Sequence, residues 1–227
     1  MRRALLRKNA SGGGFAFGNC LDFDGPNDYL SFAQYGSTTN TLAVSCWING
    51  DDINTINWPI ISDSSTNNYI RVNAINNRVV VRINSTNYFF TGFSFSNSTW
   101  YHLVMSSNAG SCRVYLNGIE STAGALSIPA SSPSTNNFAR LGFDNGGNYA
   151  NGKFDEWGLW YGSYLTPTDV ATLYNGGAGA DVSTVNIGTL WVGSHLDESG
   201  LPSTTANLGS GGTINLNNFT GTPFVAH

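Results

Sequence analysis

Carboxylates are scarce in this chain, and their spacing limits the chemistry they could perform. Its 227 residues include only three glutamates, Glu120, Glu156 and Glu198. Glu156 directly follows Asp155 and Glu198 directly follows Asp197, so neither pair has the i, i+2 or i, i+4 spacing that aims two acids of one strand at a single bond. We therefore expect no glycosidase-type acid pair and predict that the chain is not an enzyme.

Nucleophilic catalysis is not indicated either. His102 lies in an apolar-patterned segment and His195 in a Gly/Ser turn, and the sequence has no Gly-x-Ser-x-Gly elbow and no phosphate-loop motif. The three cysteines, Cys20, Cys46 and Cys112, form no Cys-x-x-Cys motif, so we expect buried free thiols. Both histidines are interpreted as structural.

Short strands separated by turns must position these residues. Turn signals such as Asn117-Gly118 punctuate the chain, and little of it has helical periodicity. This pattern predicts an all-β fold, an antiparallel two-sheet sandwich. The expected strands are 20–23, 29–32, 41–49, 60–63, 69–73, 78–84, 100–106, 113–116, 139–143 and 154–161.

One short helix is expected near the C-terminal region. Thr166 is a typical N-cap, Pro167 suits the first helical position, and Asp169 lies near the positive helix end. Asn175 and the two glycines after it are typical of a helix end. The helix should pack one apolar face on the sandwich.

Four segments of the chain, in order, resemble one family. They read "LDFDGPNDYLSF" (21–32), "TLAVSCWIN" (41–49), "STWYHLVMSSNAGSCRVYLNGIE" (98–120) and "GKFDEWGLWYGSYLTPTDVATLYNGG" (152–177). These segments are similar to laminin G-like domains of the concanavalin A-like lectin/glucanase superfamily. The resemblance implies a jelly-roll sandwich, a fold that carries lectins, glycosidases, adhesion modules and viral shell proteins.

The resemblance also implies a structural calcium ion. In many superfamily members such an ion joins the Asp of the first Phe-Asp-Gly turn to a late Asp-Glu strand, and these positions here are Asp24 and Asp155. Asn27 and nearby carbonyls could complete the set of oxygen ligands that calcium prefers. The alternative is that Asp24 caps an Asx turn while Asp155 pairs with Lys153 or a backbone amide.

Aromatic residues make up 13% of the chain, and some could stack on sugars. Trp58, in the segment "NTINWPI", is the best candidate for an exposed carbohydrate-binding side chain. The alternative is that Trp58 packs in the core, as we expect for most tryptophans here.

The first seventeen residues differ from the rest. The whole chain has a net charge of −4, and four of its ten basic residues fall in the first eight positions. The rest of the chain is therefore distinctly acidic. No continuous basic face is evident beyond the first eight positions, and we expect no nucleic-acid partner. The apolar run near the start, Ala4 to Leu6, is too short for a secretory signal, and no segment of the chain is apolar enough to cross a membrane.

We interpret residues 1–17 as a docking arm and 18–227 as the laminin G-like domain. The arm residues are Arg2, Arg3, Arg7, Lys8, Phe15 and Phe17.

Together these features favour a non-enzymatic virion protein, on a capsid or tail surface, that displays a lectin-like sandwich. Its expected partners are other virion proteins, copies of itself and host glycans. The alternative is a carbohydrate-binding adhesin module, and a polysaccharide hydrolase is the third choice. The late segment Leu190–Gly221 either closes the sandwich as a permuted edge strand or reaches into a neighbouring subunit.

Overall fold

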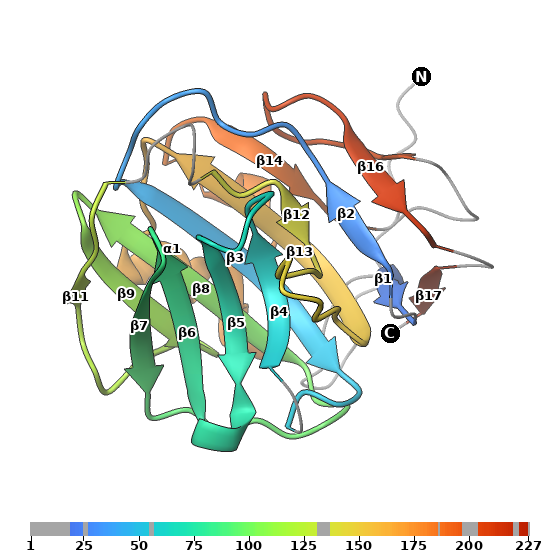
Figure 1. The fold of residues 1–227 in the computed structure, drawn as a ribbon, viewed down its shortest axis with the longest axis horizontal. Coiled ribbons are helices and arrows are strands. Elements are labelled where there is room, and N and C mark those ends of the chain that lie inside the picture. The colour runs from blue at the N-terminus through green and yellow to red at the C-terminus, as the bar shows by residue number, and fades with distance from the viewer. Residues whose placement is uncertain are drawn as a thin grey trace.

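The computed structural model describes residues 19–24, 27–54, 57–130, 137–185, 187–196, 204–219 and 223–226. Over these ranges the chain forms two antiparallel β-sheets packed face to face, with one α-helix outside them (Figure 1). This confirms the predicted sandwich. No helix within these ranges is long and apolar enough to span a bilayer. The predicted arm, residues 1–17, lies outside the described residues.

The larger sheet, sheet A, has the strand order β10-β9-β8-β3-β13-β1-β17, with β11 paired to β9 and β14 to β13. Its strands are β1 (Asn19–Phe23), β3 (Leu42–Gly50), β8 (Tyr101–Asn108), β9 (Ser111–Leu116), β10 (Ile119–Glu120), β11 (Leu126–Ser127), β13 (Gly152–Tyr161), β14 (Leu190–Ser194) and β17 (Phe224–Ala226).

The second sheet, sheet B, has the strand order β15-β16-β2-β12-β4-β5-β6-β7. Its strands are β2 (Tyr29–Ser31), β4 (Asn57–Ser62), β5 (Tyr69–Asn73), β6 (Arg78–Ile83), β7 (Thr86–Thr91), β12 (Arg140–Leu141), β15 (Thr204–Thr205) and β16 (Ile214–Asn217). Three 3₁₀ turns complete the elements: η1 (Ala74–Asn76), η2 (Asn175–Gly177) and η3 (Val182–Thr184).

Strand β7 was not predicted. It follows β6 through a two-residue turn, Asn84-Ser85, in which both residues have positive φ, at 49° and 64°. This geometry is that of the mirror-image turns that suit the twist of a hairpin, and Asn and Gly are its usual residues. We had placed Asn84 in the preceding strand, because Asn-Ser is a weak turn signal.

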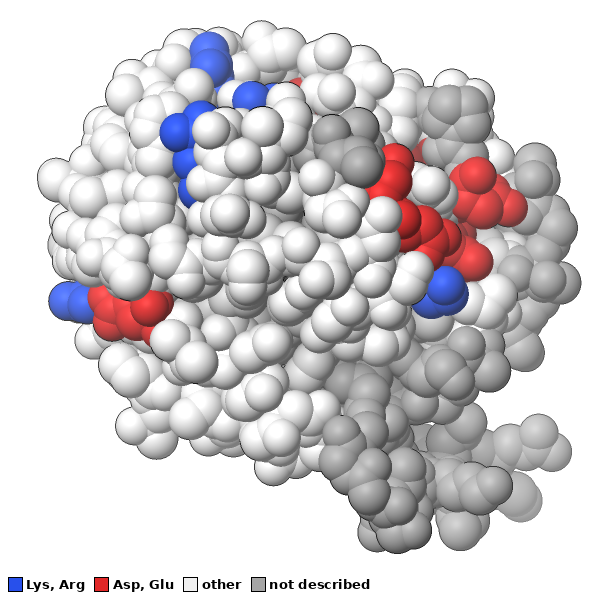
Figure 2. All heavy atoms as spheres, turned by 90° about the horizontal axis from the view of Figure 1, so that it is seen from below, with Lys and Arg blue, Asp and Glu red and all other residues white. Residues whose placement is uncertain are grey.

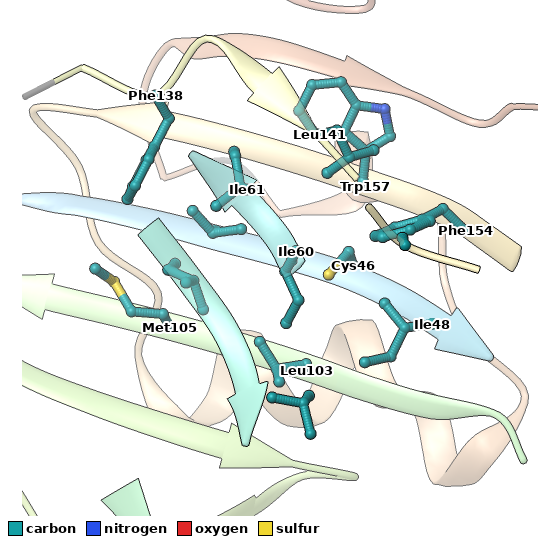
Figure 3. Packing of buried hydrophobic residues seen from close by; sticks show 14 of the residues in the cluster. Cys46, Ile48, Ile60, Ile61, Leu103, Met105, Phe138, Leu141, Phe154 and Trp157 are labelled. Atoms are coloured by element: carbon teal, nitrogen blue, oxygen red, sulfur yellow. The ribbon is translucent and has the colours of Figure 1, made fainter. Parts of the chain in front are cut away.

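A single large core fills the space between the two sheets. Strands alternate inward and outward side chains, and the inward ones interdigitate: Ile48 and Leu103 of sheet A face Ile60 of sheet B (Figure 3). Burying one such aliphatic side chain contributes about 1.5–3 kcal/mol to folding. The three cysteines are free and buried, as expected.

Helix α1 (Pro167–Tyr174) covers the outer face of sheet A. Thr166 and Asp169 form a capping box in which each side chain accepts a hydrogen bond from the other's backbone N–H. Val170 and Leu173 then pack with Trp160 in a second, smaller apolar cluster. The helix and its start are as predicted.

The end of α1 also rests on a cluster of three rings. The ring centroids of Trp47, His102 and Tyr174 are 5.1 Å (Trp47–His102), 5.9 Å (Trp47–Tyr174) and 6.1 Å (His102–Tyr174) apart, and the Ser45 hydroxyl lies 2.9 Å from His102 Nε2. Burial lowers the pKa of His102 to about 3. His102 is therefore a neutral ring that helps to dock the helix.

The C-terminal segment pairs with strands of its own chain. β13 is longer than β1, which pairs only with residues 152–154, and β14 occupies the adjoining edge along residues 157–160. β16 pairs with β2, and β17 pairs with β1. These pairings fit the first of the two alternatives for this segment, closure of the sandwich within its own chain.

The buried His102 predicts a pH dependence of stability. Its pKa is lower in the folded chain than the ordinary 6.5, so the unfolded chain binds the extra proton first as the pH falls. Stability is complete above about pH 6.5 and is lost toward pH 3, at up to about 1.4 kcal/mol per pH unit. The variant His102→Gln should lose this slope, as measured by urea unfolding at several pH values. Ser45→Ala, which keeps the imidazole, should retain it; equal slopes in His102→Gln and wild type would contradict the assignment.

Candidate ligand-binding face

Strand alternation places a row of arginines on the outer face of sheet B. In β5, Ile70 and Val72 point into the core, so Arg71 points outward. In β6, Val79 and Val81 are in the core, and the flanking arginines, Arg78 and Arg82, point outward. In β12, Leu141 is in the core and Arg140 outside it. We call the surface formed by Arg71, Arg78, Arg82 and Arg140 the arginine face.

Antiparallel register places these cations against aromatic rings. Tyr69 lies opposite Arg82, and the Cζ atoms of Arg71 and Arg82 lie 4.5 and 5.6 Å from the centre of its ring. On the neighbouring strand, Arg78 Cζ lies 3.9 Å from the ring centre of Phe89, which is 40% exposed. Cation–π contacts of this kind contribute about 0.5–1 kcal/mol at exposed sites.

A hairpin beyond β12 completes the face. Phe143 and Tyr149 stack at 4.4 Å between ring centroids, and Arg140 Cζ lies 5.5 Å from the Phe143 ring. Asp144, between them, is 2% exposed and accepts hydrogen bonds from the amides of Gly146 and Asn148 and from the Asn148 side chain. Its carboxylate also contacts Arg71 Nη1 at 3.3 Å.

Positive charge is concentrated on this face. The described residues contain six arginines and lysines, four of which lie here, against the single contacting carboxylate of Asp144. Figure 2 shows blue spheres gathered at the upper left, away from the main groups of red ones. Arg71 and Arg82 contact the same ring, so they lie within about 10 Å of each other. At that separation they repel by about 0.4 kcal/mol in bulk water and by about 1.7 kcal/mol at the effective dielectric constant of about 20 that is typical near a protein surface. Our expectation that the domain lacks a basic face is therefore wrong.

The other two cations have acidic neighbours. Arg113 forms an ion pair with Glu120 on the edge of sheet A. Lys153 lies beside Asp22, where burial raises the pKa of the carboxyl and the charge of Lys153 opposes that rise. The excess of positive charge is therefore a property of the arginine face alone among the described residues.

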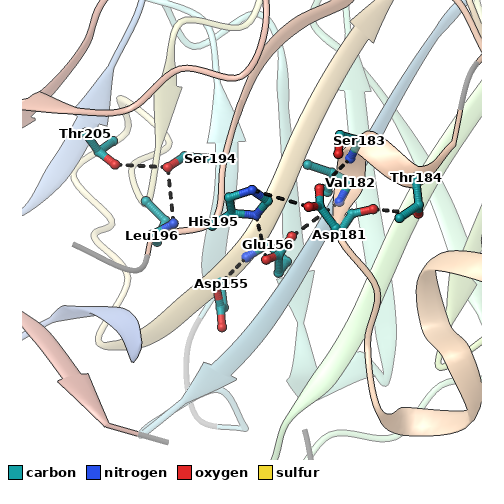
Figure 4. A network of polar contacts seen from close by, with 10 residues as sticks. All are labelled: Asp155, Glu156, Asp181, Val182, Ser183, Thr184, Ser194, His195, Leu196 and Thr205. Atoms are coloured by element: carbon teal, nitrogen blue, oxygen red, sulfur yellow. Dashed lines mark hydrogen bonds and ion pairs between the residues drawn. The ribbon is translucent and has the colours of Figure 1, made fainter. Parts of the chain in front are cut away.

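A second polar cluster joins Glu156, Asp181 and His195 (Figure 4). His195 Nδ1 lies 2.7 Å from Glu156 Oε1, and its Nε2 lies 3.5 Å from Asp181 Oδ2. The other Glu156 oxygen accepts a hydrogen bond from the Val182 amide. The Glu156 side chain is 0% exposed, and burial raises its pKa while His195 lowers it. This cluster ties η3 and the segment after β14 to the middle of β13.

Sequence reasoning missed this cluster because a β-bulge creates it. Between Asp155 and Gly158, β13 gains one residue relative to β3, and Glu156 takes a positive φ of 40° there. The histidine and carboxylate donors would suit zinc better than calcium. The direct hydrogen bond between His195 and Glu156 accounts for the arrangement without an ion.

Trp58 is not an exposed sugar-binding residue. Its side chain is 0% exposed, stacks on Phe154 at 4.9 Å, and donates from Nε1 to the Asn151 carbonyl. The sequence prediction placed Trp58 in a loop, but Trp58 and Pro59 both belong to β4, and the alternative, that Trp58 packs in the core, is the one observed. The register shift that β4 shows just after Pro59 explains how the proline is accommodated.

Comparison with known protein families agrees with this architecture. Residues 24–171 match the family model described as the concanavalin A-like lectin/glucanases superfamily. The match covers more than half of the chain. The chain belongs to this superfamily. No curated protein sequence matches it.

Two solved structures show the same fold as this superfamily member. A protein of Bacteroides ovatus ATCC 8483, provisionally described as carbohydrate-binding, has a TM-score of 0.64 at 16% identity over 92% of this chain. The chain spans 60% of that protein's length. The native heptameric SAP-like pentraxin of Limulus polyphemus has a TM-score of 0.56 at 16% identity and covers 92% of this chain and 98% of its own. At these identities the likeness shows the fold alone.

The structure does not bring the two carboxylates of the implied calcium site together. Leu21 pairs with Phe154, so Asp155 lies across from Cys20, and Asp24 follows four residues later, roughly 13 Å along the strand direction. One ion cannot readily be shared by both side chains across that distance. Calcium near Asp24 and Asn27 stays a prediction, without Asp155 as a ligand.

A chelator tests this remaining calcium prediction. An ion present at about 100 times its dissociation constant stabilises a fold by about 2.7 kcal/mol, which for a domain of this size corresponds to a melting temperature shift of roughly 5–10 °C. We expect EGTA to lower the melting temperature by this amount and the variant Asp24→Asn to abolish the effect. Asp155→Asn should still respond to the chelator. An unchanged melting temperature in wild type would exclude a structural calcium ion.

Proposed function

We propose that this superfamily member is a non-enzymatic carbohydrate-binding domain whose binding surface is the arginine face. The observation that carries the proposal is the composition of that face. It combines aromatic rings with guanidinium and amide groups, and these are the side chains that stack on sugar rings and hydrogen-bond to hydroxyl groups. The likeness in fold to a protein described as carbohydrate-binding is consistent with it.

The outer face of sheet A is a poorer candidate. Helix α1 covers it, and the apolar side chains beneath the helix, including Trp160, are buried. A shallow cleft of about 230 Å³ beside the start of the helix is lined in part by Arg113, Tyr115 and Tyr164. Arg113 is already paired with Glu120, which reduces what this cleft can offer a ligand.

Absence of catalysis belongs to the same proposal. Of the three glutamates, Glu156 is enclosed and held by His195 and the Val182 amide, and Glu120 is paired with Arg113. Neither side chain is placed to act as one of two carboxylates across a glycosidic bond. Binding without cleavage is therefore the expected behaviour.

Phe89 provides the test of the binding face. Its ring is the exposed aromatic group of the face, so Phe89→Ala should weaken binding to the glycans that the wild-type domain retains on an array by roughly three- to tenfold. Ile119, which is 72% exposed on β10 of sheet A, gives a matched control, and Ile119→Ala should bind normally. Glycan binding that is unaffected by Phe89→Ala would move the site elsewhere, and no binding to any glycan would refute the proposal.

We further propose that the domain is displayed on a virion surface, with residues 1–17 as the docking arm. The support is the sequence of the arm: its cationic cluster, the three consecutive glycines at positions 12–14, which we interpret as a hinge, and the alternating Phe15 and Phe17, which suit strand addition to an open sheet edge. Backbone ordering costs about 1–2 kcal/mol per residue, so charge alone would anchor it poorly.

Deletion of residues 1–8 tests the display proposal. The shortened chain should fold with an unchanged melting temperature and fail to incorporate into particles during assembly. A Phe15→Ala, Phe17→Ala double variant should also incorporate poorly, since it keeps every charge. Normal incorporation of the deletion would favour the adhesin alternative, in which the sandwich acts as a free binding module.

A further inference from the structure

The charge distribution of the domain points to the class of glycan that it binds. Beyond the first eight residues the chain has six basic and fourteen acidic residues, yet four of the six basic ones lie on a single sheet face. Arg113 and Lys153, the two cations outside the face, are close to carboxylates. A neutral sugar would not require this segregation of charge.

The arginines of the face are held mainly by uncharged partners. Arg82 Nη1 donates to Asn87 Oδ1 at 3.1 Å, and Arg140 Nη1 donates to Asn145 Oδ1 at 2.5 Å. Arg78 lies over the Phe89 ring. Amide oxygens and aromatic rings orient a guanidinium group without cancelling its charge. Three of these four cations therefore have no carboxylate in contact among the described residues.

Hydrogen-bonding capacity on the face is also incompletely used. The Nε atoms of Arg71, Arg78 and Arg82 are enclosed and have no hydrogen-bond partner among the described residues. A guanidinium group has five N–H donors in a planar fork, which matches the two oxygens of a carboxylate or the oxygens of a sulfate.

We propose that the arginine face selects anionic saccharides, in which carboxylate or sulfate groups repeat along the chain. This rests on the proposed carbohydrate-binding function and specifies its ligand. Arg78 and Arg82 lie four residues apart on β6, roughly 13 Å, and Arg71 lies on the adjacent strand. The cations are thus distributed over several strands, which favours a polymer with repeated charges over a single small anion.

The rings between the cations contribute the second part of the recognition. Tyr69 and Phe89 place apolar surface beside the guanidinium groups, and Phe89 is open to solvent. A polysaccharide presents both ring C–H surfaces and charged groups, whereas a small inorganic anion presents charge alone. The alternation of rings and cations therefore fits an acidic polysaccharide.

The experiment compares an acidic polymer with its neutral counterpart. Binding of the full chain to dextran sulfate and to dextran, and to polygalacturonate and its methyl ester, would be measured by biolayer interferometry at 50 and 300 mM salt. We expect the acidic member of each pair to bind at least tenfold more tightly and to weaken at high salt, since exposed charges are screened. Arg78→Gln with Arg82→Gln should lower this affinity about tenfold.

Arg113→Gln with Lys153→Gln is the matched control, because it removes two positive charges outside the face, as many as the test variant removes from it. It should bind the acidic polymers as the wild type does, and an equal loss in both variants would attribute the effect to net charge and overturn the inference. Equal affinity for acidic and neutral polymers would overturn the anionic selectivity while leaving the proposed function intact. Binding to none of them, together with an empty glycan array, would refute the proposed function itself.

Single-stranded DNA is a further control, because it carries repeated negative charges without a polysaccharide chain. If it bound as tightly as the acidic polymers, the face would recognise charge alone, and the inference would be overturned.

Discussion

The packing of two sheets against each other governs everything else in this molecule. Each strand must bury alternate side chains between the sheets, so the other side chains must lie outside. Sheet A covers much of its outer face with α1 and a second apolar cluster. On the outer face of sheet B, arginines, aromatic rings and a polar hairpin take that place. The two faces of the sandwich therefore differ in what they can offer to a ligand.

The bulge in β13 creates a second polar cluster, which is enclosed in the molecule and not displayed on its surface. One extra residue in that strand lets the Glu156 side chain meet His195 and Asp181 from the C-terminal third of the chain. The contacts link β13, η3 and the segment after β14, in the same region where β14 extends sheet A. A carboxylate that is fully enclosed must be hydrogen-bonded to be tolerated, and this one is. The burial and hydrogen bonds of Glu156 fit a structural role better than a catalytic one.

Local signals in the sequence predict most of the fold but little of the arginine face. The Thr166 cap, the Asn117-Gly118 turn and the alternating strands each depend on a few neighbouring residues, and the structure agrees with them. The arginine face depends on strand order, because β12 reaches β5 only through β4, and one sequence without the pairing does not reveal that order. The burial of Trp58, which we gave as the alternative to exposure, depends on the pairing of β4 with β5, and one sequence does not reveal that pairing either.

The Glu156 cluster and the arginine face differ in burial and in how their charges are paired. Glu156 and its partners are enclosed, where an unpaired charge would cost several kcal/mol, and they are paired accordingly. Among the residues that the structure describes, three of the four arginines on the arginine face have no contacting carboxylate, and two such cations about 10 Å apart repel by about 0.4 kcal/mol in bulk water and about 1.7 kcal/mol at the effective dielectric constant typical near a protein surface. Stability therefore gives no reason to gather four cations there. Because their position does not stabilise the fold, a ligand of opposite charge gives the better physical reason for it.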